Sequence, residues 1–134
     1  MKLLHSADQT VSLVLRLAAV ATFGIGLITL LAPSEIIHIF DGYDPGNYHF
    51  IRFIGTALIG FAVTNWLYSS FHSKEVVLPA IYGNLTSLIL AVLVDAIGLV
   101  AGVLAPAAWL ILLLHAFFAG AFIYCVLLIR KANS

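Results

Sequence analysis

Long runs of apolar residues, separated by short polar stretches, make up most of the chain. Four of them cover residues 11–32, 51–68, 79–100 and 107–129. Each is close to the roughly 20 residues that an α-helix needs to cross about 30 Å of hydrocarbon. The runs are continuous rather than alternating, which fits helices and not strands. The pattern predicts one all-α domain over residues 1–134, an integral membrane four-helix bundle.

Proline and capping residues indicate where these helices begin and end. Pro33 and Ser34 are expected to stop the first span, and Pro79 is expected in the first turn of the third. The segment 33–40 combines a helix-start signal with apolar residues at Ile36, Ile37 and Phe40. We therefore expect a short helix in the first outer loop, lying in the membrane interface.

Composition supports the membrane assignment and excludes other classes of protein. Of the 134 residues, 63% are hydrophobic and 9% charged, against roughly 45–50% and 25% in soluble domains. The formal net charge is zero, so nucleic acid is not an expected partner. The single cysteine, Cys125, provides neither a disulfide framework nor a cysteine-based metal site within one chain. The expected partner is the lipid bilayer.

Basic residues predict the orientation of the spans. With both termini in the cytoplasm, that side holds Lys2, Arg16, Lys74, Arg130 and Lys131 and leaves Arg52 outside. Short cytoplasmic loops are enriched in Lys and Arg. We expect both termini to be cytoplasmic, in the inner membrane of a bacterium.

Three ionisable residues fall in the outer half of the predicted bundle. Arg52 begins the second span, Asp95 lies near the end of the third and His115 near the start of the fourth. Ionisable groups at membrane depth are costly and are candidate functional residues. The hypothesis is a ligand-binding pocket of Arg52, Asp95 and His115. The alternative is an Arg52–Asp95 ion pair that fastens two helices.

Other polar residues form two further groups. Arg16, Asn65 and Asn84 lie toward the cytoplasmic side, where they are expected to form a polar layer that packs helices together. The alternative is a head-group or quinone site using Arg16 and Asn65. His38, Asp41, Asp44 and His49 in the first outer loop have side chains that could hold a divalent metal. Turn chemistry explains the two aspartates without one.

Small residues spaced four apart mark faces where helices can approach closely. On the second span this face is Thr56, Gly60 and Thr64, and on the first it is Ala18, Thr22 and Gly26. Every span has such a face, which favours a homo-oligomer or a place in a larger membrane complex as the expected state.

The stretch Arg52-Phe53-Ile54-Gly55-Thr56-Ala57-Leu58-Ile59-Gly60, followed by Asn65-Trp66 and later by His115 and Tyr124, resembles small bacterial four-helix membrane proteins described as DoxX-like. The resemblance implies four helices, a first span that ends at proline and a longer first outer loop. Some relatives are linked to quinone-dependent redox enzymes. No catalytic motif of theirs can be placed on this chain.

These observations favour a non-enzymatic accessory or assembly subunit of a larger membrane complex, with a lipid or pigment bound in its grooves. One alternative is a ligand-binding or redox-linked protein that uses Arg52, Asp95 and His115 for a quinone. Another is a small proton-coupled transporter that uses Asp95 and His115.

Overall fold

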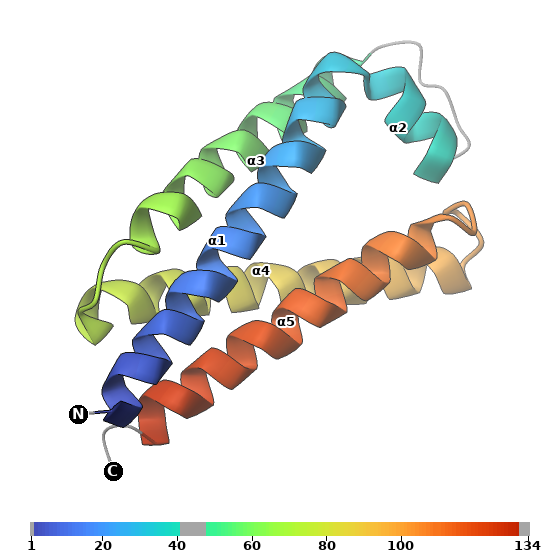
Figure 1. Ribbon diagram of the computed structural model, residues 1–134. Helices are drawn as coiled ribbons and strands as arrows, with labels where there is room; N and C mark the ends of the chain where they lie inside the picture. The colour runs from blue at the N-terminus through green and yellow to red at the C-terminus, as the bar shows by residue number, and fades with distance from the viewer. Residues whose placement is uncertain (1, 41–47, 132–134) are drawn as a thin grey trace.

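The computed structural model describes residues 2–40 and 48–131, which form five helices (Figure 1). They are α1 (Lys2–Leu31), α2 (Pro33–Phe40), α3 (His49–Tyr68), α4 (Lys74–Val100) and α5 (Ala108–Lys131). Four are long and apolar enough to cross a membrane: Ala7–Leu31 of α1 and the whole of α3, α4 and α5. The all-α prediction is confirmed, and so is the short helix after the first span.

Two spans begin earlier than the sequence predicted. The first helix starts at Lys2, and the apolar span within it at Ala7 rather than near residue 11. The third starts at Lys74, so Pro79 lies inside α4 and not in its first turn. The missing N–H of Pro79 removes one hydrogen bond, the one that would reach the carbonyl of Glu75. Because Glu75 is exposed at the end of the helix, water can satisfy that carbonyl and the helix continues.

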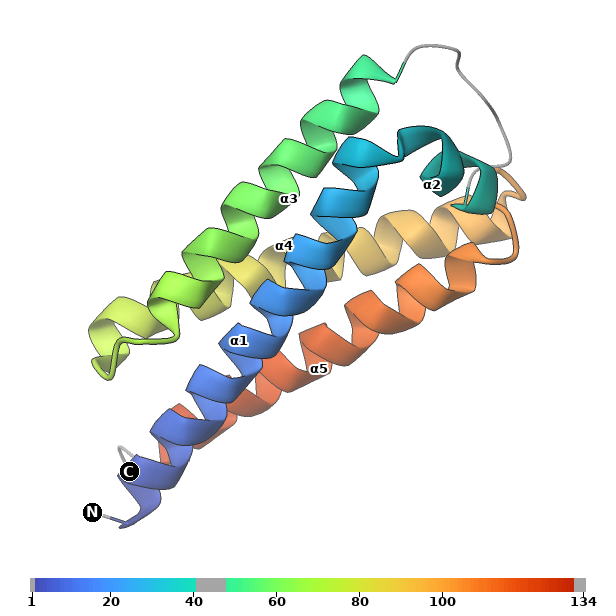
Figure 2. The same ribbon diagram turned by 45° about the horizontal axis from the view of Figure 1, so that its top comes forward.

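The four long helices form two antiparallel hairpins. α1 packs along α3, and α4 packs along α5. Figures 1 and 2 show the hairpins close together where α1 begins and α5 ends, which we call the terminal end, and diverging toward the opposite end. In both views α2 bends back from the end of α1 toward the turn between α4 and α5, and we call this the α2 end.

The core lies in the terminal half. It consists of Val11, Leu15 and Ala18 from α1, Val77 and Ile81 from α4, and Phe118, Phe122, Cys125 and Val126 from α5. Leu15, Ile81 and Phe122 are fully buried, as is the thiol-bearing side chain of Cys125. The described core therefore joins the two hairpins at the terminal end and leaves them to diverge at the other.

Two glycines set the distance between α1 and α3. A Cβ atom on Gly55 would lie 2.8 Å from the carbonyl oxygen of Gly26 and 2.8 Å from the backbone nitrogen of Leu30. Contacts below 3.0 Å with backbone atoms cannot be relieved by rotating a side chain. The predicted Gly26 face is confirmed on α1. On α3 the close contact within the chain is made by Gly55, whereas Thr56, Gly60 and Thr64 are exposed, so a close approach at that face stays a prediction.

Proline and glycine end the helices at the α2 end. α1 stops at Leu31 and Pro33 begins α2, the first helical position being where proline is best tolerated. There Ser34 Oγ donates to Glu35 Oε2 at 2.7 Å, which lowers the pKa of the Glu35 carboxyl.

α4 ends in a Schellman motif. Gly102, with φ of +68°, donates to Leu99 at 3.2 Å, and Val103 donates to Gly98 at 3.0 Å.

We predict that Gly55→Ala destabilises the protein by about 1–3 kcal/mol, because the added methyl group must push two backbones apart. Gly60→Ala, on the same helix, is the matched control, since nothing lies within 4 Å of a Cβ at Gly60. Unfolding in sodium dodecyl sulfate, followed by circular dichroism, measures both. Equal stability of the two variants would contradict the close contact.

Candidate ligand-binding groove

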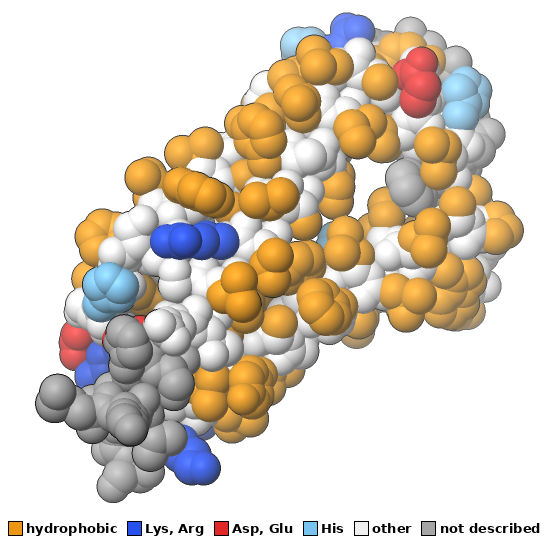
Figure 3. All heavy atoms as spheres, viewed as in Figure 1, with side chains coloured by type: hydrophobic (Ala, Val, Ile, Leu, Met, Phe, Trp, Pro, Cys, Tyr) orange, Lys and Arg blue, Asp and Glu red, His pale blue; other side chains and the backbone are white. Residues whose placement is uncertain are grey.

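The space between the diverging hairpins is a groove of about 450 Å³. Its walls are mainly apolar, with Ile25 from α1, Ile54 and Leu58 from α3, Leu88 from α4 and Leu114 from α5. Ile36 and Ile37 of α2 line it at one end, and the core residues Phe118 and Phe122 line it at the other. Figure 3 shows this hollow between the two arms, with hydrophobic side chains along its edges. All five helices contribute residues to the groove.

One ionisable side chain, His115 of α5, lines this groove. Its Nδ1 lies 2.7 Å from Oδ2 of Asp95 on α4, and the side chains of His115 and Asp95 are 29% and 17% exposed. Asp95 is the fifth residue before the end of α4, which places it about 8 Å from that end. The pair thus lies within the apolar spans, on the side toward the α2 end.

Hairpin register explains why Asp95 meets His115. Both residues lie ten positions from Ala105, in the connection between α4 and α5. In an antiparallel hairpin, residues equally distant from the turn lie at the same depth. The Schellman motif at Gly102 fixes where α4 stops, so it also fixes this register.

Arg52 does not join the pair. It is exposed on α3, in the other hairpin, and within the described residues its side chain makes no ion pair with Asp95. The expected pocket of three residues is therefore present as a pair, Asp95 and His115. α3 and α4 diverge toward the α2 end (Figure 2), so similar depth does not bring Arg52 to Asp95.

The expected polar layer contains a buried amide pair. Asn65 Nδ2 donates to Asn84 Oδ1 at 2.9 Å, and Asn84 Nδ2 donates to Asn65 Oδ1 at 2.8 Å. Asn84 also donates to the carbonyl of Ala80 at 2.8 Å. The two side chains are 1% and 4% exposed. This pair joins α3 to α4, and so one hairpin to the other, while Asn84 also lines the groove.

Arg16 lies apart from that amide pair. Its Nε donates to Ser69 Oγ at 3.4 Å, and its guanidinium carbon lies 5.8 Å from the centre of the Trp66 ring. Arg16 is exposed on α1, and Ser69 is buried directly after α3. Ser69 was not among the predicted site residues, and in the sequence only its position next to the end of a predicted span points to it.

The metal-site hypothesis can be followed for two of its four residues. Asp41 and Asp44 lie outside the described residues. His38 is exposed on α2 and His49 begins α3. Within residues 2–40 and 48–131, no group of three or more His, Cys, Asp or Glu side chains is placed to hold a metal ion.

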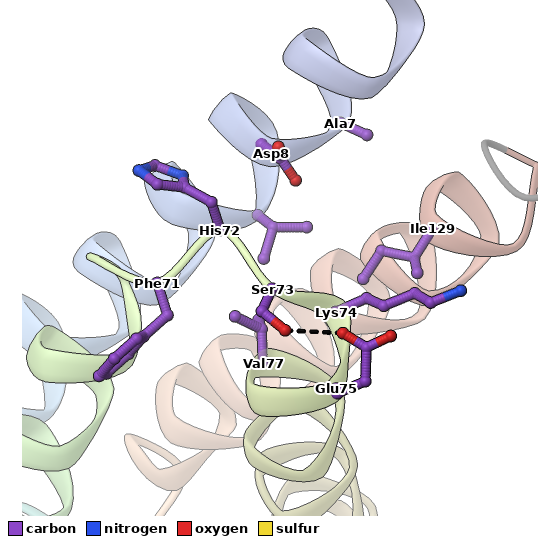
Figure 4. A pocket seen from close by; sticks show the side chains of 10 residues that line it. Ala7, Asp8, Phe71, His72, Ser73, Lys74, Glu75, Val77 and Ile129 are labelled. Carbon is purple, nitrogen blue, oxygen red and sulfur yellow. Dashed lines mark hydrogen bonds between the residues drawn. The ribbon is translucent and has the colours of Figure 1, made fainter. Parts of the chain in front are cut away.

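A second hollow, of about 350 Å³, lies at the terminal end. Figure 4 shows its polar lining, with Asp8 from α1, His72 and Ser73 before α4, and Lys74 and Glu75 at the start of α4. Ser73 Oγ donates to Glu75 Oε2 at 2.6 Å. Charged side chains are typical of the water-facing end of a membrane protein, so this hollow differs in kind from the apolar groove.

No protein-family model matches the sequence, and no curated protein or solved structure is significantly similar to it. The resemblance to DoxX-like proteins therefore stays a prediction.

We predict that Asn65→Ala and Asn84→Ala each destabilise the protein by about 1–3 kcal/mol, because each leaves a buried amide without its partner. The double variant should cost less than the sum of the single ones, since it removes both amides together. Thr64→Ala is the control, as Thr64 is exposed and bonds its own helix at Gly60. Additive effects in the unfolding titration would contradict the pairing.

Proposed function

We propose that this is an integral membrane protein that binds a lipid-soluble small molecule of the quinone type in the groove between its hairpins. The observation that carries the proposal is the position of His115, which Asp95 orients at 2.7 Å on the wall of an otherwise largely apolar groove. An apolar groove with a few convergent polar groups is the usual form of a small-molecule site.

The size of the groove fits a ring with part of an isoprenoid tail. Its volume is about 450 Å³, whereas an apolar cavity of about 150 Å³ is enough to bind benzene. The apolar residues from α1, α3 and α5 would contact the tail. The tail can continue into the bilayer, because the groove lies between spans that diverge.

The chemistry of the His115–Asp95 pair fits both redox forms of such a ligand. With Nδ1 directed at Asp95, Nε2 is the nitrogen available to a ligand. A neutral imidazole whose Nδ1–H donates to the carboxylate presents Nε2 as an acceptor for a hydroxyl group. A protonated imidazole presents Nε2–H as a donor to a carbonyl group. Asp95 acts here as a positioning residue.

The distribution of Lys and Arg supports an orientation with the terminal end in the cytoplasm of a bacterial cell. Lys74, Arg130 and Lys131 lie at the terminal end, and Arg52 lies near the start of α3 at the opposite end. In this orientation the groove opens toward the outer leaflet and α2 lies at the outer surface.

A second candidate is the accessory or assembly subunit that the sequence analysis favoured. Its specific support is the exposed face of α3 formed by Thr56, Gly60 and Thr64. Nothing lies within 4 Å of a Cβ at Gly60, so a helix of another subunit could approach closely there. The two functions are compatible, since this face and the groove involve different residues.

We predict that the purified protein binds a short-chain quinone analogue, and that His115→Leu weakens binding about tenfold through loss of one hydrogen bond, about 1.4 kcal/mol. Ala91→Phe, which fills the groove from α4, should abolish it. Isothermal titration calorimetry in detergent measures the affinities. His72→Leu is the control, because His72 lines the hollow at the terminal end.

Equal affinity in the parent protein, His115→Leu and Ala91→Phe would overturn the groove as the binding site. Mass spectrometry of the intact complex, on the same protein taken gently from its native membrane, tests the second candidate. Stoichiometric partner subunits that are lost in Gly60→Leu would support it, and a protein free of other subunits would contradict it.

A further inference from the structure

A second site lies at the terminal end, on the outside of the first hairpin, and it is independent of the groove. Its centre is Ser69, which is 2% exposed. Ser12 Oγ donates to the carbonyl of Ser69 at 2.7 Å, and Ser69 Oγ donates to the carbonyl of Trp66 at 2.6 Å. These bonds hold the start of α1 against the end of α3. Arg16 Nε donates to the same hydroxyl group at 3.4 Å.

The guanidinium group of Arg16 lies on the surface in this position. Arg16 is exposed, and Trp66, whose ring faces the Arg16 guanidinium carbon, is 52% exposed. In the described part of the chain, its contacts are a hydroxyl group and an aromatic ring, neither of which carries negative charge. Arginine has five N–H donors in a planar fork, and the contact with Ser69 uses the one on Nε.

Depth places this cation at the level of lipid head groups. Arg16 is the tenth residue of the span that begins at Ala7, which would put its backbone well inside the hydrocarbon. Its side chain, however, reaches Ser69, the first residue after α3. Helical side chains lean toward the N-terminus of their helix, and long basic side chains extend to the interface. The charge therefore lies at the membrane surface of the terminal end.

The geometry points to a binding site in which Arg16, with Trp66 and Ser69, holds the phosphate group of an anionic phospholipid. The planar fork of arginine matches two phosphate oxygens, which makes it a preferred phosphate ligand. Apolar surface continues from the site along both helices, with Leu13 and Leu17 on α1 and Val63 and Leu67 on α3 all at least half exposed. That surface would contact the acyl chains, which is why the site favours a lipid over free phosphate.

The chain contains two tryptophans, Trp66 and Trp109, which allows the site to be tested by fluorescence. In a Trp109→Phe background, Trp66 is the one tryptophan left, and excitation at a wavelength that tyrosine does not absorb reports on it alone. The protein is placed in vesicles of phosphatidylcholine that contain increasing fractions of phosphatidylglycerol, with bromine atoms on the acyl chains of one lipid or the other. Quenching of Trp66 then reports which lipid lies beside it.

We expect quenching to show about a fivefold preference for brominated phosphatidylglycerol, the equivalent of about 1 kcal/mol for one basic residue at the surface. Arg16→Gln should reduce the preference to about one, and Arg16→Lys should retain part of it. Arg130→Gln is the matched control, because it removes the same charge from an exposed position at the same end and should keep the fivefold preference.

Three results would overturn the site. Equal lipid preference in Arg16→Gln and the parent would show that Arg16 does not bind the head group. Loss of the preference in Arg130→Gln as well would show a diffuse charge effect. Displacement of the brominated lipid by millimolar inorganic phosphate would assign the site to free phosphate instead. Circular dichroism of each variant confirms that its helices are formed.

Discussion

The buried amide pair of Asn65 and Asn84 is a polar connection that sets how the two hairpins meet, beside the apolar core that joins them. α3 and α4 touch over a short stretch, and within it these two side chains exchange hydrogen bonds of 2.9 and 2.8 Å. In an apolar medium a lone amide has no water to bond. Each asparagine therefore needs the other, and this requirement selects one register of α3 against α4. Below the pair, toward the terminal end, lies the core of Leu15, Ile81 and Phe122.

Above the amide pair the hairpins are separate structures. Each is held internally, the first by the contact of Gly26 with Gly55 and the second by the Schellman turn and the His115–Asp95 pair. The groove begins where the shared core ends: Phe118, Phe122 and Asn84 line it at that end, and residues of α1, α3, α4 and α5 form its walls beyond. Among the described residues, His115 is the ionisable one on its wall, and Asp95 already holds it, so binding a ligand does not require the imidazole to be ordered first.

The sequence predicted the number and nature of the spans and the short helix of α2, because run length, proline and apolar content report those directly. It also indicated one polar pair, since residues equally far from a turn share a depth. Asp95 and His115 satisfy this rule about Ala105. Arg52 and Asp95 nearly satisfy it about the connection between α3 and α4, yet they are not paired. The depth of a residue in the membrane follows from its position along its own helix. Whether two residues touch depends on the crossing angle of their two helices, which the sequence of neither helix states.

The faces of α3 illustrate the same limit. Gly55 and Gly60 look equivalent in the sequence, but a Cβ at Gly55 would meet the backbone of α1, whereas one at Gly60 would have nothing within 4 Å. Spacing alone favours Gly60, which has Thr56 and Thr64 four residues to either side. What selects Gly55 is its pairing with Gly26 across the hairpin, a relation between two helices that no pattern within one helix contains.

The divergence of the hairpins also gives the protein an asymmetric cross-section. It is narrow at the terminal end, where both hairpins share one core, and wide at the α2 end (Figure 1). In a bilayer, a wedge of this shape would occupy more area in one leaflet than in the other. If its spans cross a bilayer, such a wedge would sit more easily in a membrane that bends away from its wide end.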